Sequence, residues 1–222
     1  RAQVSVYTIR PGTPKRVTYV LFERLNTGGL VLNPQEIRHA LNQGIPTKYL
    51  TDLVALDSFR KLVRFRDGRM KDCELALRYM AFRITPAEQY QRPLKLFLDS
   101  AMEKIANTPL LVRTRLRSEF DRALNIAFTL FGENAFSKQQ TRSQFNKALF
   151  ETLTVCLSEL TTEQQSTLQL RSQEIKQLYF GQLSDESSKL SQAVTSGTSG
   201  EEAIRNRFTE IRKLLQRVID QT

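Results

Sequence analysis

Apolar side chains recur every three or four residues through most of the chain, and this periodicity is what most limits its fold. It is clearest over residues 74–84 and 120–131, where it would place an apolar stripe along one face of an α-helix. We therefore predict a mainly α, multi-helix fold. The same pattern and its end signals predict helices near residues 15–25, 34–42, 47–56, 58–66, 71–85, 87–106, 110–131, 142–160, 163–181 and 200–220.

One β-strand is predicted, over residues 4–9, where apolar and polar side chains alternate. A turn rich in proline and glycine follows at residues 10–14. Residues 134–141 and the Ser/Thr/Gly-rich residues 195–200 have the composition of flexible connections. We expect the second connection to leave the last helix free to move.

The bulk composition is that of a globular protein: 40% of the 222 residues are hydrophobic and 25% are charged. Apolar stretches fall short of the ~20 residues that a membrane span requires, so we expect no membrane association. Cys73 and Cys156 lack the spacing of a zinc or redox motif, which favours a reducing compartment and a cytoplasmic location. The chain begins at Arg1 without a methionine, and we expect further sequence before it.

The positive charge is concentrated near the start of the chain. The formal net charge is +10, and residues 1–71 hold 13 lysines and arginines against 5 acidic residues, a net charge of +8. A dense basic segment gains affinity for nucleic acid by releasing counterions from phosphates, although a solvated helix face explains the same pattern equally well. The candidate DNA-binding residues are Arg60, Lys61, Arg64, Arg66, Arg69 and Lys71.

A short loop around residues 24–33 has features of an anion site. Gly28 and Gly29 predict the end of one helix, and the run from Asn33 to Glu36 predicts a capped start of the next. Free amides at that start, permissive glycines and the guanidinium of Arg24 could hold a nucleotide phosphate. The spacing is not that of a Walker loop, and a simple helix stop is the commoner interpretation of two such glycines.

The sequence VLFERLNTGG at residues 20–29, followed by LNPQEIR at residues 32–38, resembles the GmrSD-type restriction endonuclease N-terminal domain family. Weaker matches occur at residues 74–82 and 145–151. Proteins of this family have a ParB/sulfiredoxin-like core followed by a helical region. The resemblance therefore implies that residues 1–45 are the C-terminal part of such a core, with a small β remnant, and that residues 46–222 form a helical domain.

The resemblance also implies a function in restriction or anti-phage defence. Such a module binds a nucleoside triphosphate with Mg²⁺, senses modified phage DNA and controls a separate nuclease domain or subunit; a homo-oligomer is compatible with this role. The family's Asp-Gly-Gln-Gln-Arg motif is absent here, so NTP hydrolysis by this chain alone is left open. By resemblance, with Arg24 and Arg38 facing phosphate, the nucleotide-binding residues are Arg24, Asn26, Gly28, Gly29, Gln35, Glu36 and Arg38.

Two other classes of protein, a nuclease and a helical scaffold, are alternatives to this function. A nuclease in its own right is disfavoured because His39 is the only histidine and has no neighbouring co-ligand. A non-catalytic helical scaffold for protein interaction would need no nucleotide, and its glycine pair would only end a helix.

Arg113 and Arg117 would share one helix face, and their mutual repulsion could be relieved by a bound phosphate.

Overall fold

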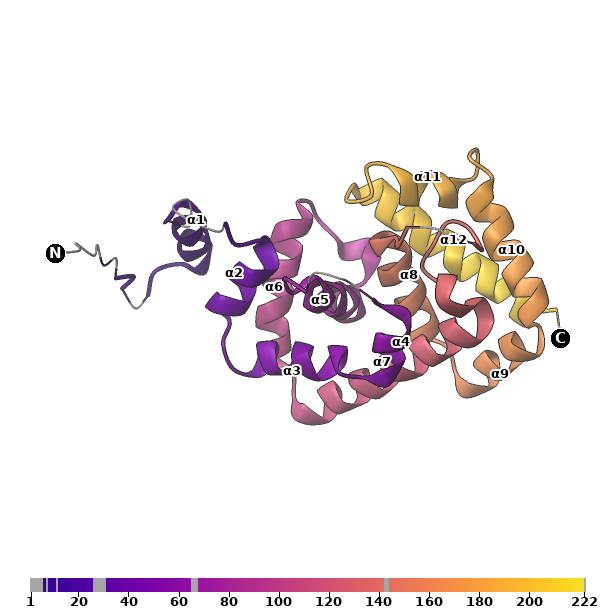
Figure 1. Cartoon of the computed structure of the whole chain (residues 1–222), viewed down its shortest axis with the longest axis horizontal. Coiled ribbons are helices and arrows are strands. Elements are labelled where there is room, and N and C mark those ends of the chain that lie inside the picture. Colours follow the sequence, from indigo (N-terminus) through magenta and orange to yellow (C-terminus); the bar gives the residue numbers. More distant parts are fainter. Residues whose placement is uncertain are drawn as a thin grey trace.

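The computed structural model describes residues 6, 8–10, 12–25, 31–64, 68–141 and 144–221, and this part of the chain is mainly helical (Figure 1). The elements are α1 (Lys15–Leu25), α2 (Pro34–Leu41), α3 (Ile45–Val54), α4 (Asp57–Leu62), α5 (Lys71–Ile84), the 3-10 turn η1 (Ala87–Gln89), α6 (Leu94–Asn107), α7 (Leu110–Phe131), the 3-10 turn η2 (Gly132–Asn134), α8 (Lys147–Ser158), α9 (Thr162–Leu170), α10 (Ser172–Ser184), α11 (Lys189–Thr195) and α12 (Glu201–Ile219). The prediction of a mainly α fold is confirmed.

The β-strand predicted over residues 4–9 is not seen. Val6, Thr8 and Ile9 lie outside any strand, and the other positions of that stretch lie outside the described residues. An extended segment needs a neighbouring strand to satisfy its backbone hydrogen bonds, and the described ranges contain no strand to pair with it. The β remnant of a ParB/sulfiredoxin-like core therefore stays a prediction.

The core is organised around α8, whose residues 148–158 are all buried. Helices α5, α7 and α12 pack against it, which is why α8 is apolar around most of its circumference. Aromatic side chains from three helices meet there: the ring centroids of Tyr79 and Phe120 are 4.3 Å apart, and those of Phe120 and Phe150 are 6.3 Å apart. Such pairs add about 0.5–1.5 kcal/mol each beyond the burial of their surface.

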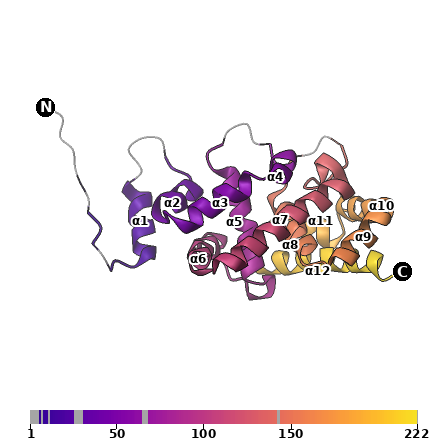
Figure 2. The ribbon, with the colours of Figure 1, turned by 90° about the horizontal axis from the view of Figure 1, so that it is seen from below.

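Helix α12 is part of this core, contrary to the expectation that the last helix would be free. It lies beside α8 and α11, and Figure 2 shows it running along one side of the molecule. Ile204, Phe208 and Ile211 are fully buried. The hydroxyl of Tyr90 also donates to the carbonyl of Ser199 at 2.9 Å, which fixes the connection before the helix.

Two predicted helices are each divided into two elements in the structure, and one short helix was not predicted. The helix predicted over residues 87–106 is divided into η1 and α6 at Pro93, because a proline disfavours helical backbone in the residue before it. The helix predicted over residues 163–181 is divided into α9 and α10 at Arg171. The short helix α11 was not predicted, since its seven residues span too few turns to show a helical repeat of apolar side chains.

Helices α1 and α2 form the end of the molecule that carries the N-terminus (Figure 1). Tyr19 of α1 is buried, and its hydroxyl accepts a hydrogen bond from Nδ2 of Asn42 at 2.5 Å. Helix α2 packs against α5 and α6. The domain boundary at residue 45 stays a prediction. Within the described residues, none of the helices combines the length and apolar character that crossing a bilayer requires.

Candidate nucleotide and DNA interface

The start of α2 has the predicted capping box. The side-chain oxygen of Asn33 accepts hydrogen bonds from the amides of Gln35 and Glu36 at 2.9 and 3.0 Å. In return, Oε2 of Glu36 accepts the amide of Asn33 at 2.7 Å, and Pro34 occupies the first helical position. Two of the amides expected to be available to an anion are therefore already satisfied by Asn33.

Arg69 joins the basic segment to this helix start. Its Nη2 lies 2.8 Å from Oε2 of Glu36, its Nε lies 3.1 Å from Oε1, and Nη2 also donates to the carbonyl of Val31 at 2.7 Å. The Nδ2 of Asn33 donates to the carbonyl of Arg69 at 2.7 Å. Two residues of the predicted nucleotide and DNA sites, Glu36 and Arg69, are thus brought together. The hydrogen bond from Arg69 lowers the pKa of Glu36.

Arg38 and Gln35 point into the helical body. The Nε of Arg38 lies 2.7 Å from Oδ1 of Asp99 on α6, and its Nη2 donates to the carbonyl of Lys95 at 3.3 Å. Gln35 is buried and accepts a long contact of 3.4 Å from Nη1 of Arg38, while its own Nε2 donor has no acceptor. Arg38 holds α2 against α6 in this structure, so its phosphate-facing role stays a prediction.

The remaining predicted nucleotide-binding residues belong to the end of α1 and the loop after it. Arg24 is exposed in the last turn of α1. Asn26, Gly28 and Gly29 lie outside the described residues. The nucleotide-binding role of these residues therefore stays a prediction.

The basic residues of α4 differ in their surroundings. Arg60 is exposed. The ammonium of Lys61 lies 3.5 Å from the centre of the Phe128 ring on α7, a cation–π contact that anchors the side chain. Of these two cations, Arg60 is therefore the more accessible to a phosphate.

The other basic candidates follow α4. Arg64 forms an ion pair of 3.1 Å with Glu133, and both side chains are more than 60% exposed, so the pair is weak. Lys71 begins α5 and is half-buried. Arg66 lies outside the described residues. Because its ion pair with Glu133 is weak, Arg64 can exchange that carboxylate for a phosphate with little loss of free energy.

The structure contains a buried network of charges that was not predicted from the sequence. Glu151 of α8, fully buried, forms an ion pair with Arg207 of α12 and a second of 2.9 Å with Arg78 of α5. Arg78 and Lys147 also contact Glu74, at 2.8 and 3.2 Å. The two weaker motif matches, at residues 74–82 and 145–151, thus meet in space. Opposite charges spaced four residues apart in each segment were the available signal.

The only histidine and the two cysteines show no arrangement for catalysis. His39 is half-buried on α2, and the described ranges hold no group of three His, Cys, Asp or Glu residues suited to a metal ion. Cys73 and Cys156 are buried free thiols. Burial raises the pKa of Cys73 to about 12, which keeps this thiol protonated and unreactive at neutral pH.

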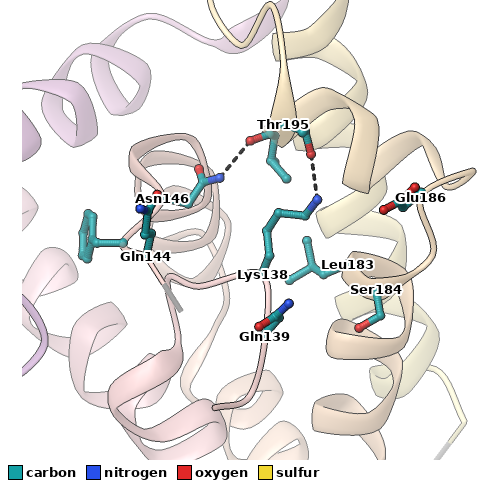
Figure 3. Close-up of a pocket in the computed structure, with 10 residues that line it drawn as sticks. Lys138, Gln139, Gln144, Asn146, Leu183, Ser184, Glu186 and Thr195 are labelled. Carbon is teal, nitrogen blue, oxygen red and sulfur yellow. Dashed lines mark hydrogen bonds between the residues drawn. The ribbon is translucent and has the colours of Figure 1, made fainter. Parts of the chain in front are cut away.

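A polar cavity of about 490 Å³ lies between residues 138–139 and 144–146 on one side and the helices α10 and α11 on the other (Figure 3). Its polar groups bind one another: Nζ of Lys138 donates to Oγ1 of Thr195 at 2.8 Å, and Nδ2 of Asn146 donates to the carbonyl of Val194 at 2.8 Å. No residue of the predicted nucleotide or DNA site lines it. These contacts tie the segment before α8 to α11.

The fold and the site define a mainly helical protein in which a capped helix start is tied to a basic segment by an ion pair. No family model, curated protein or solved structure matches the chain.

Proposed function

We propose that this chain is a nucleotide-dependent DNA-sensing module of a restriction or anti-phage defence protein. A nucleoside triphosphate with Mg²⁺ binds near the loop that follows Arg24, and modified phage DNA binds along residues 60–71. The bound state controls a separate nuclease domain or subunit. The observation that carries the proposal is the two-pronged ion pair between Glu36 and Arg69.

The ion pair supports communication between the two sites. Glu36 belongs to the helix that follows the nucleotide loop, and Arg69 belongs to the basic segment. Paired guanidinium and carboxylate groups have a fixed relative orientation, so a shift of α2 on nucleotide binding would move the basic segment with it. Reciprocity then requires DNA to change the affinity for nucleotide by the same factor.

The coupling is tested by measuring the Kd for duplex DNA with and without ATP or GTP in the presence of Mg²⁺. We expect nucleotide to change the Kd by about fivefold or more, the lower range of ordinary coupling energies. Glu36→Gln should remove this change, whereas Arg64→Gln should weaken DNA binding and leave the nucleotide effect in place. A nucleotide effect that survives in Glu36→Gln would contradict the proposed route.

The DNA contact is tested by a salt series on the double variant Arg60→Gln/Arg64→Gln. If each guanidinium meets one phosphate, the slope of log K against log salt concentration should fall by about 1.8. The variant Arg205→Gln/Arg217→Gln removes the same charge from exposed positions on α12 and should change the slope little. Equal effects of the two variants would mean that only net charge attracts DNA.

A further inference from the structure

A pocket of about 370 Å³ lies between α3 and the first half of α7, apart from the nucleotide and DNA sites proposed above. Tyr49 closes one side: its hydroxyl donates to the carbonyl of Arg113 at 2.7 Å and joins the two helices. The residues that line the pocket are Ile45, Lys48, Tyr49, Asp52, Leu110, Arg113, Thr114 and Arg117.

The pocket carries an excess of positive charge. Lys48, Arg113 and Arg117 line it against the single carboxylate of Asp52, and none of the three cations forms an ion pair within the part of the chain that the structure describes. Arg113 and Arg117 are one helical turn apart and repel each other. The Nη1 donor of Arg113 is enclosed without an acceptor. An anionic group in the pocket would relieve the repulsion between the two guanidinium groups.

Exposed apolar side chains distinguish this pocket from an ordinary phosphate site. Leu110 is 71% exposed and Ile45 is 49% exposed, and both line the pocket; Leu111, 81% exposed, lies next to it in sequence. A nucleic-acid backbone presents mainly charged phosphates, which are poor partners for these apolar side chains. A peptide that carries an apolar side chain between acidic ones would bury them and neutralise the cations together.

We propose that this pocket binds an acidic peptide segment of a partner protein, in which glutamate or aspartate flanks a leucine-like side chain. The carboxylates pair with Arg113, Arg117 and Lys48, and the apolar side chain packs on Leu110 and Ile45. The inference is independent of the proposed nucleotide and DNA sites, because it rests on residues of α3 and α7 that neither site uses.

The test uses a short fluorescent peptide in which glutamate and leucine alternate, with anisotropy as the measure of binding. We expect the variant Arg113→Gln/Arg117→Gln to weaken binding by about tenfold or more. Arg115→Gln is a control on the same helix, because it removes a positive charge from an exposed position outside the pocket, where Arg115 pairs with Glu119 at 3.6 Å. It should change the Kd by no more than about twofold. Unchanged circular dichroism would establish that the variants fold.

The apolar part is tested by Leu110→Gln, which should weaken peptide binding without changing the net charge. A peptide of alternating glutamine and leucine should bind at least about tenfold more weakly than the acidic one. The proposal is overturned if the acidic peptide does not bind the wild-type chain, or if Arg115→Gln weakens it as much as the double variant. Displacement of the peptide by duplex DNA that itself loses affinity in Arg113→Gln/Arg117→Gln would instead make the pocket a DNA contact.

Discussion

Glu151 is the residue on which the electrostatics of the interior depend. It is fully buried between Arg78 and Arg207, and Arg207 is only 1% exposed. Arg207 also donates from Nε to the hydroxyl of Thr152 at 3.0 Å and from Nη1 to the carbonyl of Thr198 at 2.6 Å. Buried charges are tolerated when they are paired and hydrogen-bonded, and each of the three guanidinium nitrogens of Arg207 has an acceptor in this network.

We expect Glu151→Gln to lower the free energy of unfolding by about 3–5 kcal/mol, because it leaves two guanidinium groups buried beside a neutral amide. Urea unfolding measures the loss. The control is Glu133→Gln, which breaks the exposed pair with Arg64 and should lower the free energy by no more than about 1 kcal/mol. Comparable losses in the two variants would show that burial does not set the strength of the network.

Glu74 gives the network a dependence on pH. Burial alone would raise the pKa of this carboxyl, but the charges of Arg78 and Lys147 outweigh it and hold the pKa below the ordinary 4.5. The pKa is thus lower in the folded chain than in the unfolded one. The stabilisation is therefore complete above about pH 4.5 and is lost as the pH falls through the folded-state pKa.

We accordingly predict that Glu74→Gln flattens the acid side of the stability profile. Urea unfolding of the wild type between about pH 7 and pH 3 should show a falling free energy of unfolding, and the variant should show a shallower fall. Glu202→Gln, which removes an equal charge from an exposed position, controls for net charge. An acid slope in Glu74→Gln as steep as in the wild type would contradict the assignment.

Among the elements, helix α2 has a capped start that is also hydrogen-bonded to a distant segment. Asn33 caps the helix through its side-chain oxygen and reaches the carbonyl of Arg69 through its side-chain nitrogen. Helix α9 has the same type of capping box at Thr161, and within the described part of the chain this cap makes no hydrogen bond to a distant segment. Substitutions at Asn33 and at Thr161 can therefore be compared to separate the free energy contributed by a cap from that contributed by a long-range hydrogen bond.

Asn33→Ala should lower the free energy of unfolding by about 2 kcal/mol, roughly half from the cap and half from the hydrogen bond to Arg69. Thr161→Ala loses only a cap and should lower it by about 1 kcal/mol. Asn33→Asp keeps the capping oxygen and loses the amide donor, so it should fall between the wild type and Asn33→Ala. Thermal unfolding followed by circular dichroism measures all three; an Asn33→Asp variant as unstable as Asn33→Ala would contradict this division.

Local sequence signals predict the start and the bounds of some helices well. The start of α2 was predicted from Asn33, Pro34 and Glu36, and the bounds of α7 agree with the prediction of residues 110–131, since apolar spacing extends through the whole helix. The contact of Glu36 with Arg69 could not be predicted. These residues are far apart in sequence, and only the packing of α2 against α5 brings them together.

At the scale of the whole molecule, burial increases from the N-terminal end towards the centre. Helix α1 leaves Val17, Val20 and Leu21 about 40% exposed. Helix α12, at the other end of the chain, buries Phe208 and Leu215 against the core. A helix near a chain end is therefore not always loosely held. The Ser/Thr/Gly-rich composition of residues 195–200 suggested a free last helix, but the apolar face of α12 holds it against the core.

Hydrogen–deuterium exchange should reveal this gradient. We expect peptides from α12 to exchange only through global unfolding, at the rate of α8, because opening α12 would expose core aromatic side chains. Peptides from α1 should exchange faster, since Tyr19 is the only buried side chain among those of α1 that the structure describes. Mass spectrometry under native conditions measures both; exchange of α12 as fast as that of α1 would show that the last helix detaches on its own.

The bond between Glu36 and Arg69 also bears on how this chain can change over evolutionary time. Reversing either charge alone would set two like charges against each other and would leave the carbonyl of Val31 or the amide of Asn33 without its partner. Exchanging the two charges would restore an ion pair but would leave both of these backbone groups without their partners, so each residue is constrained by more than the charge of the other. A related sequence that has lost one of these two residues should therefore have lost the other as well.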